Sequence, residues 1–398
     1  MKRIALAIAA CCAAPVGAAA NHSFNPDISL ILQGRYLNAE DIAERHITGF
    51  LPAGHDHGSE RGFSLDHSEL TLSANIDQAF RGQANFAVAD GAVEVEEAWF
   101  QTLGLGQGFT VKGGRFLSGI GYSNEQHPHA WDFAEQSLVY QALFGAHLIQ
   151  DGVQLRWLAP TTTFVEFGVE AARGQYFPGS EAGGDKNGAG SAAAFVHIGD
   201  DWNASHSWRA GVSYLHATPA ARESHLEDAS ETEAHAVFSG DSNTWLVDFV
   251  WKWAPDGNRR ERNFKLQAEY FQREEEGELT CEDNSADGGV CNDTTGRYTS
   301  DQSGFYAQAV YQFMPRWRVG YRYDRLDSGT VDFGANAGRL EHTDYQPTRH
   351  SLMLDYSPSE FSRLRLQLSR DESMRGVTDN QVTLQYAMSL GVHGAHRF

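Results

Sequence analysis

The sequence predicts an all-β fold, a transmembrane antiparallel β-barrel of about 16 strands with short periplasmic turns and long extracellular loops. Three observations carry this prediction. Apolar and polar residues alternate along most of the chain, short and long connections alternate between these segments, and the N-terminus has the features of an export signal.

Composition narrows the class before any element is assigned. Beyond the N-terminus, no part of the 398-residue chain approaches the roughly 18 to 20 consecutive apolar residues that a membrane helix requires. The 23 Phe, 14 Tyr and 9 Trp argue against a disordered chain. A net charge of −21 argues against a nucleic-acid partner, because phosphate backbones require basic patches. A large secreted β protein and an outer-membrane barrel remain.

The N-terminus predicts a secretory signal peptide over residues 1–20. A basic start at Lys2 and Arg3 is followed by an apolar stretch, and the small residues Ala18–Ala20 form a cleavage pattern. We therefore expect a mature barrel domain over residues 21–398. Lipidation at Cys11 is the weaker alternative, because the apolar run continues past that cysteine.

Two cysteines, Cys281 and Cys291, remain after removal of the signal peptide. In an exported chain, two nearby cysteines predict a disulfide bond. The intervening sequence is short, polar and rich in Gly, so we expect the bond to pin a loop tip rather than a core. Metal binding by the pair is the weaker alternative, because an oxidising compartment removes the thiolates.

Alternation with a period of two defines the strands in order. In the N-terminal half the alternating segments are 28–36, 70–76, 80–88, 93–103, 109–111, 153–157, 165–169 and 194–198. In the fourth of these, Val93, Val95 and Trp99 are expected to share the apolar face with Leu103. In the C-terminal half the segments are 208–214, 245–253, 264–270, 305–313, 317–323, 352–356, 364–368 and 382–390.

The direction of the apolar face decides between the two remaining classes. A soluble sandwich would turn it inward, and Trp245, Phe249, Trp251 and Trp253 would then need a very large core. A membrane barrel turns it toward lipid and lines its lumen with polar residues. We therefore expect these charged residues to line the pore: Lys112, Arg156, Arg209, Lys252, Lys265, Arg318, Arg322, Arg363, Arg365, Glu94, Glu96, Glu166 and Glu170.

The mixed charge of this wall has two interpretations. The charges either pair across strands and serve stability alone, or they create a transverse field that orients small polar or charged solutes. The basic residues near 318–322 and 363–365 would favour anions, and acidic loops would gather cations.

The connections support the barrel. The expected short turns are 77–78, 104–108, 159–161, 314–316 and 357–359, and the expected long loops are 38–62, 117–147, 172–191, 217–242, 272–302 and 325–349. An even number of strands places both chain ends in the periplasm. The terminal Phe398 follows an alternating last segment and resembles the signal that the barrel-assembly machinery of the outer membrane recognises.

Histidine is the other unusual feature, with 17 in the chain. Two pairs have the spacing i, i+2, which places both imidazoles on one side of an extended segment, and two further histidines lie among carboxylates. Imidazole with carboxylate suits zinc. The candidate metal ligands are His55, His57, His127, His129, His225 and His235. The alternative is that they are solvated loop residues. No cofactor is required, and Zn²⁺ is expected only as a transported or loop-bound ion.

Several segments resemble a proteobacterial outer-membrane family labelled zinc-regulated receptors, sometimes called TonB-dependent. The resemblance is carried by residues 67–76 (HSELTLSANI), 114–133 (GRFLSGIGYSNEQHPHAWDF) and 248–271 (DFVWKWAPDGNRRERNFKLQAEYF). It implies an outer-membrane barrel made under zinc shortage. A TonB-dependent receptor carries a plug, and we expect none here, because alternation begins soon after residue 21. Residues 112–116 (KGGRF) are loosely similar to phosphate-selective porins.

Likeness to porins also indicates a role for the long loop 117–147. In general porins this loop folds inward and narrows the pore, so we expect the same of 117–147, with Ala130–Phe133 as an anchor to the wall.

The expected function is an outer-membrane channel for small polar solutes in a Gram-negative bacterium, with zinc or a zinc complex captured by histidine-containing and acidic loops. A structural or adhesive barrel without transport is the alternative. A lipid hydrolase, suggested by Asp66-His67-Ser68, has the weakest support. Membrane lipid and lipopolysaccharide are the expected partners, and a trimer is left open.

Overall fold

The structure is a computed structural model that describes residues 26–42, 45–51, 61–89, 92–182 and 188–391. The predictions on the signal peptide 1–20, on His55 and His57, and on the terminal Phe398 lie outside these residues.

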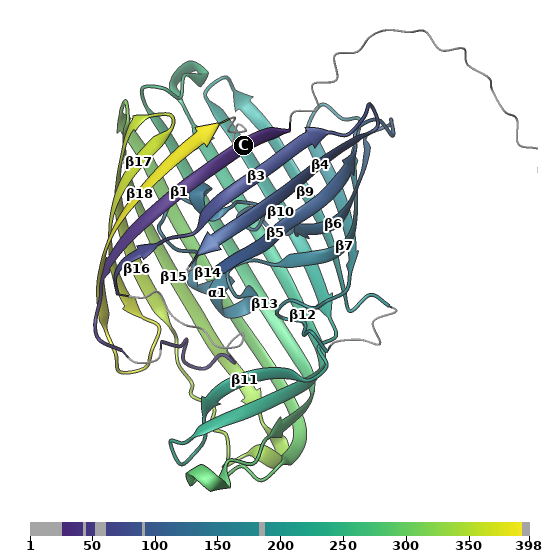
Figure 1. Ribbon diagram of the computed structural model, residues 1–398, viewed down its shortest axis with the longest axis vertical. Helices are drawn as coiled ribbons and strands as arrows, with labels where there is room; N and C mark the ends of the chain where they lie inside the picture. Colours follow the sequence, from purple (N-terminus) through teal and green to yellow (C-terminus); the bar gives the residue numbers. More distant parts are fainter. Residues whose placement is uncertain (1–25, 43–44, 52–60, 90–91, 183–187, 392–398) are drawn as a thin grey trace, which may run out of the picture.

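The described chain forms one closed antiparallel sheet (Figure 1). Of its 18 strands, the short β2 (Gly62–Leu65) and β11 (Arg222–Glu227) do not span the wall, which leaves 16 that do. β1 pairs with both β18 and β3, which closes the barrel. The wall strands are β1 (Asp27–Asn38), β3 (Ser68–Asn75), β4 (Phe80–Ala89), β5 (Ala92–Thr102), β6 (Phe109–Leu117), β7 (Ile149–Leu158), β8 (Phe164–Ala172), β9 (Ser191–Asn203), β10 (His206–Ala217), β12 (Glu233–Trp253), β13 (Asn263–Cys281), β14 (Thr294–Met314), β15 (Trp317–Asp332), β16 (Thr348–Ser359), β17 (Ser362–Glu372) and β18 (Asp379–Gly391).

Each of the predicted segments coincides with one wall strand, so the predicted fold class and strand number are confirmed. The described helices are short: α1 (Leu138–Phe144), η1 (Pro128–Ala130), η2 (Pro255–Gly257), η3 (Ser285–Asp287) and η4 (Gly334–Asn336). In the described part of the chain, no helix has the length and apolar character needed to cross a membrane.

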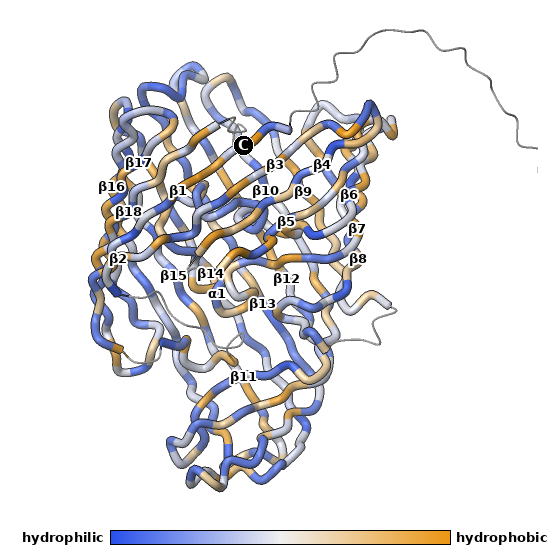
Figure 2. The backbone as a smooth tube through the Cα atoms, viewed as in Figure 1, coloured by the Kyte–Doolittle hydropathy of each residue, from blue (hydrophilic) through white to orange (hydrophobic). Residues whose placement is uncertain are grey.

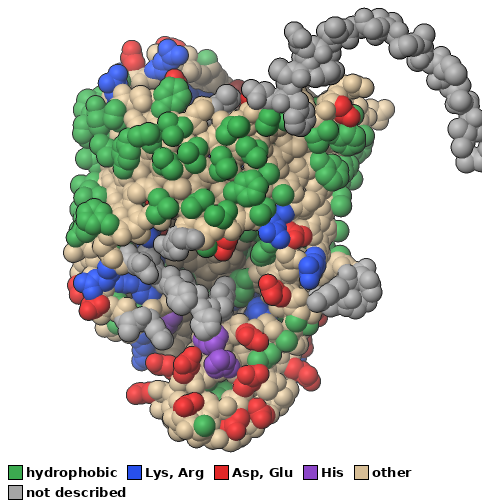
Figure 3. All heavy atoms as spheres, viewed as in Figure 1, with side chains coloured by type: hydrophobic (Ala, Val, Ile, Leu, Met, Phe, Trp, Pro, Cys, Tyr) green, Lys and Arg blue, Asp and Glu red, His purple; other side chains and the backbone are tan. Residues whose placement is uncertain are grey.

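The apolar face of the wall points outward. On β12, Trp245 is 56% exposed and Val247 50%, while the intervening Leu246 and the next residue, Asp248, are buried inside. Orange and blue alternate along the wall strands in Figure 2, and apolar side chains form a broad belt across the face of the barrel that Figure 3 shows. So large an exposed apolar surface is stable in lipid and not in water. The protein is therefore an outer-membrane β-barrel, as the sequence predicts.

A β-bulge on β5 corrects one predicted face. Asn85 of β4 pairs with Glu97, whereas the next residue, Phe86, pairs with Val95, so Glu96 is the extra residue. The extra residue reverses the alternation beyond it. The prediction that Trp99 faces outward with Val93 and Val95 is therefore wrong: its Nε1 donates to Glu97 Oε1 at 3.2 Å inside the barrel.

Two predicted loops, 217–242 and 272–302, are largely strand. β12 and β14 have 21 residues each and β13 has 19, although about 9 to 11 residues suffice to cross the membrane. The surplus, together with β11 and the end of β15, forms a sheet beyond the membrane at the end opposite the C-terminus (Figure 1). We call this part, residues 218–244, 272–303 and 326–347, the extension. The prediction of long loops is therefore wrong in large part for 217–242 and 272–302, whereas in 325–349 only the two ends belong to strands.

The extension has its own apolar core. Phe238, Leu279, Tyr298 and Phe333 are buried in it, together with the predicted disulfide bond between Cys281 and Cys291. The bond is thus confirmed, but it lies within a core and not at an exposed loop tip. The sequence pattern did not indicate this core. The outer face of these strands is polar, and few apolar residues stand between its Glu and Thr side chains.

Residues 118–148, which we call the inserted segment, fold into the barrel as predicted. Helix α1 lies inside the wall in Figure 1. Its residues Leu138, Tyr140 and Phe144 are buried against Leu246 of β12 and Phe271 of β13. Burial of a Leu or Phe side chain contributes about 1.5–3 kcal/mol. The inserted segment is therefore a packed part of the fold that fills a portion of the lumen.

Candidate functional site

The inserted segment crosses the lumen and meets walls of opposite character. His127 and His129 face an acidic wall on β3 and β5. Asp132 and Glu135, a few residues later, face a basic wall on β13 to β17. One short stretch of the inserted segment therefore contacts both walls.

Three carboxylates and three imidazoles meet at the acidic wall. We call them the lumen histidine cluster: His67, Glu69, Glu96, Glu97, His127 and His129. The atom pairs are close: His67 Nε2 to Glu96 Oε1 is 2.9 Å, His127 Nε2 to Glu97 Oε2 is 3.0 Å, and His129 Nδ1 to Glu69 Oε1 is 2.8 Å. His127 Nδ1 also lies 3.4 Å from both Glu69 Oε2 and Glu96 Oε2.

Local structure explains why so many carboxylates converge. Glu69 follows the ordinary alternation of β3 and points inward. Glu96 and Glu97 are consecutive, and the bulge on β5 is what allows both to reach the lumen. Asn85 on the intervening β4 donates through Nδ2 to Glu69 Oε2 at 3.1 Å and so ties the cluster together.

The carboxylates of the cluster favour the protonated form of His127. Burial alone would lower the pKa of His127, but the charges of Glu69 and Glu97 and hydrogen bonding to Glu96 outweigh burial and raise that pKa well above its ordinary value. Among the described residues near Glu69 and Glu96, imidazoles are the principal balancing cations. The site therefore favours positive charge, whether carried by protons or by a metal ion.

The basic wall fixes the other half of the inserted segment. Asp132 pairs with Lys265 and lies 3.1 Å from Arg318 Nη1. Arg363 Nη2 donates to the carbonyl oxygen of His129 at 3.0 Å, and Arg365 Nη2 to that of Trp131 at 3.0 Å. Much of the positive charge on this wall is thus used to hold the inserted segment.

Other predicted pore-lining residues also contact the inserted segment. Arg156 pairs with Glu125 and lies 3.4 Å from Glu166, while Glu170 accepts from Gly119 N at 2.8 Å. Further contacts are Lys112 to Glu125, Arg209 to the carbonyl of Gly121, Lys252 to the ring of Tyr122, and Arg322 to Glu135. Glu94, by contrast, is exposed.

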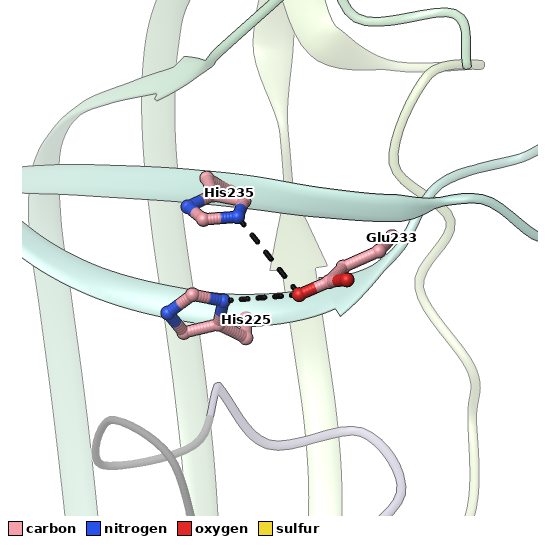
Figure 4. A group of neighbouring side chains, drawn as sticks. All are labelled: His225, Glu233 and His235. Carbon is pink, nitrogen blue, oxygen red and sulfur yellow. Dashed lines mark ion pairs between the residues drawn. The ribbon is translucent and has the colours of Figure 1, made fainter. Parts of the chain in front are cut away.

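A second group of metal-ligating side chains lies in the extension. His225 on β11 and His235 on β12 face each other beside Glu233 (Figure 4). We call these three the outer histidine cluster. His225 Nδ1 is 3.5 Å and His235 Nε2 3.9 Å from Glu233 Oε1. The structure thus brings together two predicted metal ligands that are ten positions apart in sequence, as it does His127 and His129.

Three residues of the lumen histidine cluster, His67, Glu69 and Glu97, are not among the site residues predicted from the sequence. Glu69 could have been found, because it lies on the polar face of an alternating strand. Glu97 could not, because the bulge breaks the alternation. The triplet Asp66-His67-Ser68 does not form a nucleophile and base: His67 contacts Glu96, while Ser68 Oγ accepts from the backbone nitrogen of Gln33 at 3.0 Å.

Solved structures with the same architecture are porins and other outer-membrane barrels. OmpT of Vibrio cholerae, in vitro folded and in a trimer form, has a TM-score of 0.55 at 12% identity and covers 92% of this chain and 99% of its own. The anion-selective porin from Comamonas acidovorans has a TM-score of 0.54 at 10% identity, with coverage of 92% and 99%. OprB of Pseudomonas putida has a TM-score of 0.53 at 12% identity, with coverage of 92% and 94%. At such identities the likeness shows the fold alone.

Sequence comparison gives a more direct relative. No family model matches the chain. A protein of Aquifex aeolicus (strain VF5), described as uncharacterized, is 32% identical over 400 aligned positions that cover 94% of this chain and 80% of that protein. The chain is therefore an outer-membrane barrel with the porin fold, and it belongs to the same family as this Aquifex aeolicus protein.

Proposed function

We propose that the protein is a porin-like channel for small polar solutes that favours divalent cations of the zinc type. The observation that carries the proposal is the lumen histidine cluster, which the inserted segment holds against the acidic wall. A passive channel suits a barrel whose lumen is divided by its own chain and lined by charge on both sides.

The donor set of the cluster fits zinc. Zinc is bound by imidazole nitrogens and carboxylate oxygens at about 2.0–2.2 Å, whereas calcium and magnesium prefer oxygen alone. One ligand atom from each of His67, Glu69 and Glu96 lies within 4.8 Å of the others. His127 contacts both of these carboxylates and His129 contacts Glu69, so five donor residues surround one small region.

The basic wall supports the transport part of the proposal. Asp132 and Glu135 pair with part of its charge, and Arg363 and Arg365 bind backbone carbonyl oxygens of the inserted segment, whose histidines meet the acidic wall. A transverse field of this kind orients a polar solute and retains a cation at the acidic side. The resemblance of residues 114–133 to zinc-regulated receptors is consistent with this choice of solute, since that stretch contains His127 and His129.

Planar-bilayer conductance tests the proposal. We expect the full-length barrel to conduct, to select cations, and to show potassium currents that micromolar Zn²⁺ reduces. Glu69→Gln with Glu96→Gln should weaken both cation selectivity and the effect of zinc. Glu274→Gln with Glu276→Gln removes equal charge from the outside and is the matched control. A sealed barrel would reject the channel, and anion selectivity that zinc does not alter would reject the cation site.

Partners belong to the same proposal. We infer that the barrel contacts lipid and lipopolysaccharide through its apolar belt and is inserted by the assembly machinery through its C-terminal segment. Because one structural neighbour is described as a trimer form, we infer a trimer here as well. Native mass spectrometry of the detergent-extracted protein distinguishes a trimer from a monomer.

A further inference from the structure

We propose that the outer histidine cluster, His225, Glu233 and His235, is a binding site for a zinc-type divalent cation at the external mouth of the barrel. Its role as the first binding site that an imported cation reaches rests on the function proposed above. Binding of the cation at this cluster does not rest on it.

The strand register places the ligands. His225 and His235 are directly opposite each other in the antiparallel pair of β11 and β12, and their ring centroids are 4.2 Å apart. In Figure 4 the carboxylate of Glu233 points toward both rings from one side. In a tetrahedral zinc site, two ligand atoms at 2.0–2.1 Å from the ion are about 3.3 Å apart. The observed spacings of 3.5 Å and 3.9 Å to Glu233 Oε1 therefore require only small rotations of the side chains.

The neighbouring charges point to a cation independently. Glu227 is directly opposite Glu233 in the same register, so two carboxylates face each other beside two imidazoles. Like charges directly opposite each other destabilise an antiparallel pair. A divalent cation held by Glu233 and the two imidazoles would offset this repulsion.

Hydrogen bonds and apolar packing tie the hairpin that carries the cluster to the rest of the extension. Asp228 in its turn accepts hydrogen bonds from Ser230 N at 2.8 Å, Val290 N at 2.7 Å and Asn284 Nδ2 at 2.8 Å. Val290 and Asn284 belong to the loop that the disulfide bond closes. On the opposite face of the hairpin, Ala234 and Ala236 pack into the core of the extension. An anchored support reduces the ordering cost of binding.

The cluster is accessible from outside. The side chain of Glu233 is 71% exposed and that of His235 46%, whereas that of His225 is only 18% exposed. Histidine and carboxylate side chains gather on the surface of the extension in Figure 3. Two imidazoles favour zinc, nickel or copper over calcium and magnesium. With three protein ligands, a fourth position stays open for water, which suits reversible capture.

Titration of the full-length barrel in detergent with ZnCl₂ tests the site. We expect His225→Ala with His235→Ala to weaken binding at this site at least tenfold, in the range seen when metal-site residues are lost. Glu233→Gln should weaken it less, and this variant keeps the test valid if the double variant misfolds. His216→Ala is the matched control, because His216 is half-exposed on β10 and faces a single carboxylate, Asp241, at 3.9 Å.

A second variant separates the two sites. Glu69→Gln with His127→Ala should remove binding in the lumen and leave the outer affinity unchanged. The proposal is overturned if zinc binding is unchanged in the outer double variant, or if calcium competes as well as zinc. Loss of all binding in the lumen variant would also overturn it. If zinc binds the outer site but no zinc flux enters liposomes, the channel proposal fails and the outer site stands.

Discussion

At the scale of single residues, buried charge helps to hold the inserted segment against the wall. Asp132 is surrounded by Lys265, Arg318 and the amide of Gln308. Burial alone would raise the pKa of Asp132, but the charges of Lys265 and Arg318 outweigh burial and hold that pKa well below its ordinary range. The carboxylate therefore stabilises the folded state in its ionised form.

Because the pKa of Asp132 is lowered in the folded state, the stability of the protein should depend on pH. The unfolded chain takes up a proton at Asp132 near pH 4, before the folded chain does. The stabilising contribution of Asp132 should be complete above about pH 4 and decline as the pH falls toward the folded pKa. Thermal unfolding followed by circular dichroism between pH 7 and pH 3 should show this loss.

The Asp132→Asn variant tests the assignment. It should be destabilised by about 1–3 kcal/mol at neutral pH, because Lys265 and Arg318 are only partly buried and lose one partner. Its acid-induced decline should be smaller than that of the unmodified protein. A variant that declines in parallel with the unmodified protein would assign the pH dependence to another group.

At the scale of elements, one strand passes through two environments. The second half of β12 lies in the apolar belt, where Val247 is exposed to lipid, whereas its first residues belong to the extension. The side chains alternate between the two faces along the whole strand, but the kind of residue on the outward face changes with the solvent. Outward residues are apolar where lipid is the solvent, and they are charged or imidazole-bearing where water is.

Arginine substitutions on the outward face of β12 locate the boundary between its lipid-facing part and its part in the extension. Val247→Arg should reduce the free energy of unfolding by about 2–4 kcal/mol, the cost of a charge near the middle of the bilayer. Val237→Arg, on the same face but in the extension, should change it by no more than about 0.5 kcal/mol. Urea unfolding in lipid vesicles gives both values, and equal penalties would place Val237 in the membrane.

The disulfide bond is an element-scale constraint on the extension. It closes a loop with a sequence separation of 10, for which the chain-entropy model gives about 2–3 kcal/mol. Cys281→Ser with Cys291→Ser should make the extension sensitive to trypsin and weaken zinc binding at the outer cluster. The mobility of the unheated barrel on gels should stay the same, because the wall strands do not depend on the bond.

At the scale of the whole molecule, the inserted segment determines how open the lumen is. Leu143 is buried among the residues that join α1 to the wall, so Leu143→Ala should cost about 2–5 kcal/mol locally. We expect larger and noisier single-channel currents, because the segment should leave its seat more often. Leu352→Ala, a truncation on the lipid face, is the control. Unchanged currents in Leu143→Ala would show that the segment does not limit conductance.

The sequence predicted the barrel well because one physical rule, lipid outside and water inside, acts on every wall strand. It predicted less where that rule is broken. The bulge at Glu96 reversed the face of Trp99, and strands that leave the membrane in the extension lost the apolar outer face that identified them. The pairing of His225 with His235 depends on register, and the approach of His127 to Glu69 depends on a long-range insertion. Neither leaves a local pattern.

The closure between β1 and β18 has a consequence for biosynthesis. Ten residue pairs, from Ser29 with Gly391 to Asn38 with Val382, join the first strand to the last. A chain that stops before β18 would leave two open edges, on β1 and on β17, and each unsatisfied backbone group in hydrocarbon costs several kcal/mol. Truncated chains should therefore fail to insert and should be degraded by periplasmic proteases. Barrel closure thus restricts insertion to chains that include β18.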